Sequence, residues 1–159
     1  GGAGVVLVTF QAGPRLVEGR EGRTGRGTPD ESRRWQLLLD GRRPEPFHPA
    51  DLRQFVIAGG ANLDPGKGAG IKAAIRQLLD DPRLQDPRPT SAEAGRNTVE
   101  WDNAGHMRVD YILPSVNLPG ADAGVLWSLP GTDSASRASR HRLVWVDIEL
   151  PRPDPSGSD

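Results

Sequence analysis

The fold is decided by residues 55–65, which read FVIAGGANLDP. The four apolar residues at 55–58 predict a buried strand, and the two glycines that follow predict a sharp exit from it. The end of such a strand is a common position for an active site in an α/β protein. Gly60 and Asn62 stand at this position, although neither side chain can take a proton from water.

Apolar patterns on both sides of this stretch predict further strands and helices. Residues 70–81 carry apolar side chains at helical spacing, and Thr28 to Glu31 form a capping box that predicts a helix start. The order β, α, β, α, followed by several strands, predicts an α/β fold in which helices cover a mixed sheet. In chain order, strands are expected at 4–10, 55–58, 98–101, 107–114, 124–127 and 142–150, and helices at 28–41 and 70–81.

The length and composition bound the class of protein. The 159 residues predict one domain over residues 1–150, followed by a polar tail at 151–159 that we expect to be disordered. A formal net charge of -1 leaves the class of partner open. The absence of cysteine excludes disulfides, cysteine nucleophiles and thiolate metal sites. No apolar run approaches the roughly 18 residues that a membrane span requires, so no membrane partner is expected.

Several catalytic patterns can be compared with the sequence. Residues 61–68, ANLDPGKG, lie near the phosphate-loop pattern but lack its first glycine and its final hydroxyl, and Pro65 removes a backbone donor. No G-x-S-x-G elbow is present, which disfavours serine-hydrolase chemistry, and the scattered acids form no clustered metal motif. The arginine-rich segment 11–28 is either a solvated loop or a phosphate-contacting loop.

Asp110 is the most informative polar residue, because it lies within the apolar run MRVDYILP. A carboxylate there is costly unless it is paired, and a histidine ring would satisfy it and fix its own tautomer. Of the three histidines, His48 lies in a proline-rich loop and His106 on the same segment, so His141 is the best partner. The alternatives are that Asp110 caps a turn or pairs with a nearby arginine, and that His141 lies on the surface.

Three segments in order resemble the endonuclease/exonuclease/phosphatase superfamily, the metal-dependent phosphoesterases related to DNase I. FVIAGGANLDP resembles its G-D-x-N turn, MRVDYILPS its R-[IV]-D-Y-[IV]-L strand, and SRHRLVWVDI its terminal S-D-H strand. Loops between these segments are similar to a bacterial, often exported, branch of the family. The resemblance covers roughly residues 4–150, the C-terminal half of the family's domain.

The resemblance implies a fold and a reaction. The fold would be part of a DNase I-like four-layer α/β sandwich with mixed β-sheets. The reaction would be phosphoester hydrolysis with Mg²⁺ or Mn²⁺, in which a water attacks phosphorus in line. Asn62, Asp110 and His141 match catalytic positions of the motifs. Gln11 stands at a position where the family's residue contacts the phosphate, and Arg140 is assigned to phosphate binding through its positive charge.

Departures from the motifs predict impaired catalysis. Gly60 replaces the acid that aligns the water, and Arg140 replaces an acid beside the terminal histidine, where a cation would repel Mg²⁺. We therefore expect poor metal binding, with no metal ligand assigned. The alternative is a non-catalytic phosphate- or anion-binding module, or a structural module, with the same fold.

The expected partners follow from the same resemblance. They are a phosphoester substrate or anion, with nucleic acid as one option, and a second polypeptide that would complete the sandwich. No signal peptide is visible, while the resemblance to the exported branch favours a periplasmic or extracellular location.

Overall fold

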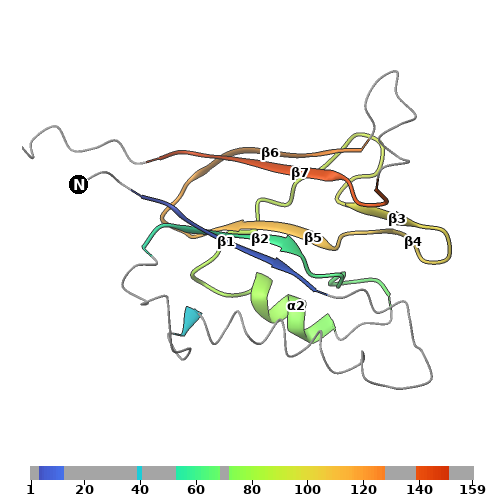
Figure 1. Cartoon of the computed structure of the whole chain (residues 1–159), viewed down its shortest axis with the longest axis horizontal. Coiled ribbons are helices and arrows are strands. Elements are labelled where there is room, and N and C mark those ends of the chain that lie inside the picture. The colour runs from blue at the N-terminus through green and yellow to red at the C-terminus, as the bar shows by residue number, and fades with distance from the viewer. Residues whose placement is uncertain (1–3, 13–38, 41–52, 69–71, 128–138, 151–159) are drawn as a thin grey trace, which may run out of the picture.

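Strand β2, Phe55–Gly60, is the central strand of the main sheet, whose strand order is β1-β2-β5 (Figure 1). This computed structural model describes residues 4–12, 39–40, 53–68, 72–127 and 139–150. Two further pairs, β3-β4 and β6-β7, complete the described strands. The remaining elements are β1 (Val6–Gln11), α2 (Lys72–Leu79), β3 (Val99–Trp101), β4 (Gly105–Met107), β5 (Asp110–Pro114), β6 (Gly120–Leu126) and β7 (Leu143–Ile148).

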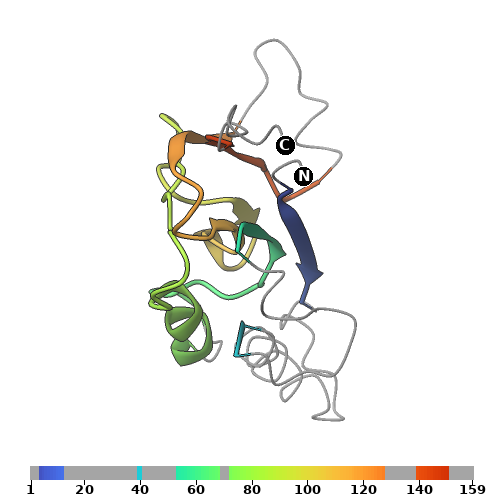
Figure 2. The same cartoon turned by 90° about the vertical axis from the view of Figure 1, so that its left-hand side faces the viewer.

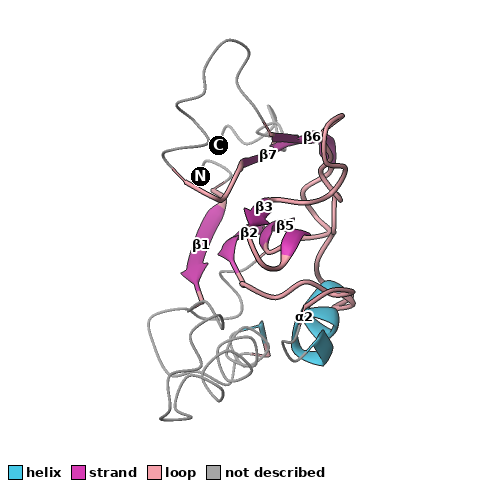
Figure 3. Cartoon of the chain, turned by 90° about the vertical axis from the view of Figure 1, so that its right-hand side faces the viewer, coloured by secondary structure: helices cyan, strands magenta, loops and turns pink. Residues whose placement is uncertain are grey.

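The main sheet is mixed, because β2 runs parallel to β1 and antiparallel to β5. Helix α2 covers one side of this sheet, and Ile75 and Leu78 bury their side chains in a core that includes Ile57 and Leu113. In Figures 1, 2 and 3 the β6-β7 pair lies on the side of the sheet away from α2. The mixed sheet and its covering helix confirm the predicted α/β class.

The predicted strand at 107–114 is interrupted, and its single-strand description was wrong. Residues 105–107 belong to β4 and residues 110–114 to β5. Between them, the backbone N–H of Arg108 donates to the Asp64 carboxylate, and those of Val109 and Asp110 donate to the Thr98 hydroxyl. Because side chains accept these three N–H donors, the strand is interrupted here, although the carbonyl of Val109 still accepts the backbone N–H of Ala61 at 2.8 Å.

The other predictions differ mainly in their bounds. Strand β6 begins at Gly120, four residues before the predicted 124–127 strand. The intrinsic strand propensity of residues 120–123 is low, so this part of the strand depends on its pairing with β7. Helix α2 and strands β1, β3 and β7 form where strands and helices were expected. The tail, most of the arginine-rich segment and residues 28–38 of the other predicted helix lie outside the described residues. Within the described residues, no helix is long and apolar enough to cross a membrane.

The two glycines that end β2 are not equivalent. A Cβ atom on Gly59 would lie 1.9 Å from the backbone oxygen of Phe10 on the neighbouring strand. A Cβ atom on Gly60 would meet the amide end of the Gln11 side chain at 2.9 Å. Gly59 therefore allows β1 and β2 to pair, whereas Gly60 leaves space that a flexible side chain occupies.

We expect Gly59→Ala to lower the free energy of unfolding by about 2–4 kcal/mol, because the backbone of β1 must move away. Gly60→Ala is the matched control and should cost about 1 kcal/mol or less, since Gln11 can rotate aside. Urea denaturation of both variants measures the difference. Equal losses of stability would contradict the account of close strand pairing at Gly59.

Candidate functional site

Site residues on three neighbouring strands form a row at the end of the main sheet where β1 and β2 end. Gln11 of β1 pairs with Gly60 of β2, and Gly60 pairs with Asp110 of β5. The side chains of Gln11 and Asp110 lie on the same face, because a Cβ atom on Gly60 would lie 2.9 Å from the Gln11 amide and 3.1 Å from Asp110 Oδ1. Because residue 60 has no side chain, no atom of β2 separates the Gln11 amide from the Asp110 carboxylate on this face.

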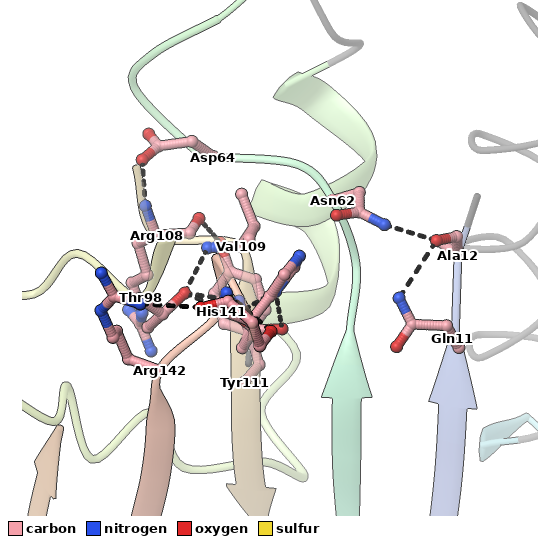
Figure 4. Close-up of polar contacts among 12 residues, drawn as sticks. Gln11, Ala12, Asn62, Asp64, Thr98, Arg108, Val109, Tyr111, His141 and Arg142 are labelled. Atoms are coloured by element: carbon pink, nitrogen blue, oxygen red, sulfur yellow. Dashed lines mark hydrogen bonds and ion pairs between the residues drawn. The ribbon is translucent and has the colours of Figure 1, made fainter. Parts of the chain in front are cut away.

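His141 extends this row beyond Asp110. Its Nδ1 lies 3.0 Å from Asp110 Oδ1 and 2.9 Å from Oδ2, so the predicted pairing is present (Figure 4). The side chains of His141 and Asp110 are 34% and 19% exposed, which leaves the imidazole accessible from one side. The catalytic role of the pair stays a prediction.

The segment that carries His141 is positioned by strand β3. An isolated bridge joins Val99 to His141, and the backbone N–H of Arg142 donates to the carbonyl of Thr98 at 2.8 Å. The N–H of Glu100 donates to the carbonyl of Arg140 at 3.2 Å. Pairing between residues 98–100 and 140–142 therefore fixes the position of His141 relative to the sheet.

Thr98 is a site residue that sequence reasoning missed. Its side chain is fully buried, and its hydroxyl donates to Asp110 Oδ2 at 2.8 Å. The same oxygen accepts the backbone N–H groups of Val109 and Asp110 at 3.0 and 3.1 Å. No motif in the sequence marks this threonine, because its contacts depend on how the β3-β4 hairpin meets β5.

Asn62 ties the end of β2 to the end of β1. Its backbone adopts a positive φ of 50°, which asparagine tolerates better than most residues. Its Nδ2 donates to the carbonyl of Ala12, which also accepts a long hydrogen bond of 3.4 Å from Gln11. Asn62 Oδ1 is buried without a partner, and Figure 4 shows it turned away from Ala12. A buried water molecule would satisfy this acceptor.

Arg140 and His106 form ion pairs outside the row. Arg140 pairs with Asp102 of the β3-β4 turn at 2.8 Å, and both side chains are mostly exposed at 58% and 77%. His106 pairs with Glu100 at 3.2 Å and does not contact Asp110. His48 lies outside the described residues. Phosphate binding by Arg140 stays a prediction.

A buried ion pair fixes the backbone that leads into Asp110. The two terminal guanidinium nitrogens of Arg108, Nη1 and Nη2, donate to the carboxylate of Asp86, and the Arg108 side chain is only 7% exposed. The guanidinium also lies 4.6 Å from the ring centre of Tyr111. Burial raises the pKa of the Tyr111 hydroxyl, so this group stays protonated and donates to the carbonyls of Leu63 and Arg108.

The side chains of the site do not fit a Mg²⁺ or Mn²⁺ ion. These ions require several oxygen ligands, usually including carboxylates. In the row, Asp110 supplies one carboxylate, and both of its oxygens already contact His141. Across the part of the chain that the structure describes, no group of three or more His, Asp or Glu residues could hold a metal.

We expect Asp86→Asn to lower the free energy of unfolding at pH 7 by about 3–5 kcal/mol, because it leaves Arg108 buried without its counter-ion. Burial alone would raise the pKa of the Asp86 carboxyl, but the hydrogen bonds and charge of Arg108 hold that pKa below its usual range. The native pair therefore stabilises the fold fully above the unfolded pKa of about 4, and this contribution is lost as the pH falls through the lower native pKa.

The difference between wild type and Asp86→Asn should accordingly shrink below about pH 4, as measured by urea denaturation at several pH values. Asp102→Asn, which removes the exposed partner of Arg140, serves as the control and should change stability little. A difference that stays constant down to pH 2 would contradict the assignment of a charged pair.

Among known proteins, solved structures are similar to this chain. No family model matches the chain, and no curated protein matches it. The chain is similar to an endonuclease/exonuclease/phosphatase family protein from Leptotrichia buccalis C-1013-b, with 20% identity and a TM-score of 0.49 over 75% of this chain and 41% of that chain. It is also similar to the APE2 catalytic domain of Xenopus laevis, with 15% identity and a TM-score of 0.48 over 92% of this chain and 52% of that chain. The chain thus spans about half the length, or less, of these two structures.

Proposed function

We propose that this chain is a phosphate-binding polypeptide of the endonuclease/exonuclease/phosphatase family whose capacity for phosphoester hydrolysis is impaired. The observation that carries the proposal is the Asp110–His141 pair, which was expected from two separate motifs and lies 2.9 Å apart. The three motifs, taken in order, resemble those of the family and support the proposal, and phosphoester hydrolysis is the reaction of that family.

The charge balance of the site supports phosphate binding. The carboxylate of Asp110 is shared with His141 and Thr98, so its charge is partly satisfied by hydrogen bonds. Gly60 adds no second acid, so an approaching phosphate meets less repulsion than it would beside two carboxylates. The exposed amide of Gln11 and the accessible edge of His141 are the donors that we assign to the phosphate oxygens.

The same features support impaired hydrolysis. Attack on phosphorus needs a water that is aligned and deprotonated, and the residue expected to align it is Gly60, which has no side chain. Gln11 and Asn62 carry amides that do not exchange protons, and the one carboxylate of the row, Asp110, already accepts from Thr98 and contacts His141, so His141 is the residue left to handle a proton at the site. A phosphoester is therefore expected to bind and to be released largely unhydrolysed, whether it is a nucleic acid or a small ester.

Inorganic phosphate should bind wild type in the presence of EDTA with a Kd on the order of 1 mM, as measured by calorimetry. His141→Ala should weaken binding about tenfold or more, since a hydrogen bond to a charged group is lost. His106→Ala is the matched control, because this exposed histidine pairs with Glu100 away from Asp110, and it should bind like wild type.

Hydrolysis is measured separately, with p-nitrophenyl phosphate and a short oligonucleotide in Mg²⁺ or Mn²⁺. We expect rates near background in wild type and in His141→Ala. Rapid metal-dependent turnover that disappears in His141→Ala would contradict impaired catalysis. Failure of wild type to bind phosphate, with or without metal, would contradict the binding site itself.

We also propose that the exposed faces of the strands pack against another polypeptide surface. That surface belongs either to a further part of this protein or to a second chain. Large apolar side chains are exposed on three strands: Leu7 of β1, Leu126 of β6, and Leu143 and Trp145 of β7. Leu126 and Leu143 lie directly opposite each other across β6-β7. An exposed apolar pair of this kind is typical of an interface.

The isolated chain should consequently associate with itself as its concentration rises, as measured by light scattering after size-exclusion chromatography. Leu143→Asp should reduce this association, because it places a charge in the apolar pair with Leu126. Val116→Asp, an exposed apolar position outside the strands, serves as the control. A wild-type chain that stays monomeric at every concentration would contradict an interface between copies of this chain.

A further inference from the structure

We propose that Thr98 is a positioning residue that fixes which nitrogen of His141 faces the site. The inference follows from counting donors and acceptors along a chain of three side chains, and it requires no bound ligand. The role of this tautomer in ligand binding rests on the phosphate site proposed above, whereas the assignment of the tautomer itself does not.

The chain begins at the Thr98 hydroxyl, which has one donor and two acceptor positions. The backbone N–H groups of Val109 and Asp110 fill both acceptor positions, at 3.0 and 3.1 Å. Neither backbone group can reverse its direction, because an amide nitrogen only donates. The single hydroxyl proton must therefore be donated, and its partner is Asp110 Oδ2 at 2.8 Å.

The second link is the Asp110 carboxyl. Because Thr98 donates to Asp110 Oδ2, this oxygen is an acceptor and carries no proton. His141 Nδ1 approaches both oxygens of this carboxylate, at 3.0 and 2.9 Å. A carboxylate has no proton to give, so Nδ1 must carry the proton and donate it.

The third link is the free nitrogen of the ring. With Nδ1 protonated, Nε2 of a neutral His141 carries the lone pair, and Nε2 of a charged His141 carries a second proton. Nε2 is thus the atom that can accept a proton from a ligand or donate one to a phosphate oxygen. Since Thr98 is fully buried, it acts on the ligand only through Asp110 and His141.

The tautomer is measured by long-range ¹H–¹⁵N correlation of the His141 ring in the intact chain, at an alkaline pH where imidazole is neutral. Wild type should show the Nδ1–H tautomer in at least about tenfold excess, the ratio expected for one favourable hydrogen bond. Thr98→Ser keeps the hydroxyl and should preserve this excess. Thr98→Val has a similar shape without the hydroxyl, and the excess should fall several-fold.

Two results would overturn the proposal. One is a wild-type His141 that holds its proton on Nε2, which needs no variant to be observed and so remains decisive if Thr98→Val does not fold. The other is a folded Thr98→Val, checked by its backbone amide spectrum, whose tautomer ratio equals that of wild type. Loss of phosphate binding with an unchanged tautomer would count against the phosphate site, not against the role of Thr98.

Discussion

The register of the central strand is the constraint on which the rest of the structure depends. Strand β2 pairs with β1 on one side and β5 on the other, so Gln11, Gly60 and Asp110 are placed directly opposite one another. A shift of one residue in either pairing would turn these side chains to the other face of the sheet. Gly59 supports the register, because a side chain there would collide with the backbone of Phe10.

The site is completed by contacts that cross between segments far apart in the chain. Thr98 binds three groups at the start of β5 through one hydroxyl, and its carbonyl accepts from Arg142 beside the histidine. This one residue therefore connects the β3-β4 hairpin, the acid of the pair and the segment that carries its partner. Such saturated polar groups hold a buried network in one arrangement, since any alternative would leave donors unpaired.

The sequence was sufficient to predict the features that depend on local pattern. The apolar run at 55–58 gave the central strand, helical spacing gave α2, and the cost of a lone buried acid identified the partner of Asp110. Features that depend on tertiary contact were not predictable in this way. The break at residues 108–109 arises from side chains of Asp64 and Thr98, and the first part of β6 forms only by pairing with β7.

The central claim is that phosphate binds at the open end of this register without a metal ion, and residue-resolved NMR tests it most directly. Inorganic phosphate is titrated into ¹⁵N-labelled protein in EDTA while backbone, amide side-chain and imidazole signals are followed. The account predicts that the largest shifts fall on Gln11, Gly60, Asn62 and His141 and saturate together. Shifts confined to other residues, or shifts at these positions only after Mg²⁺ is added, would contradict it.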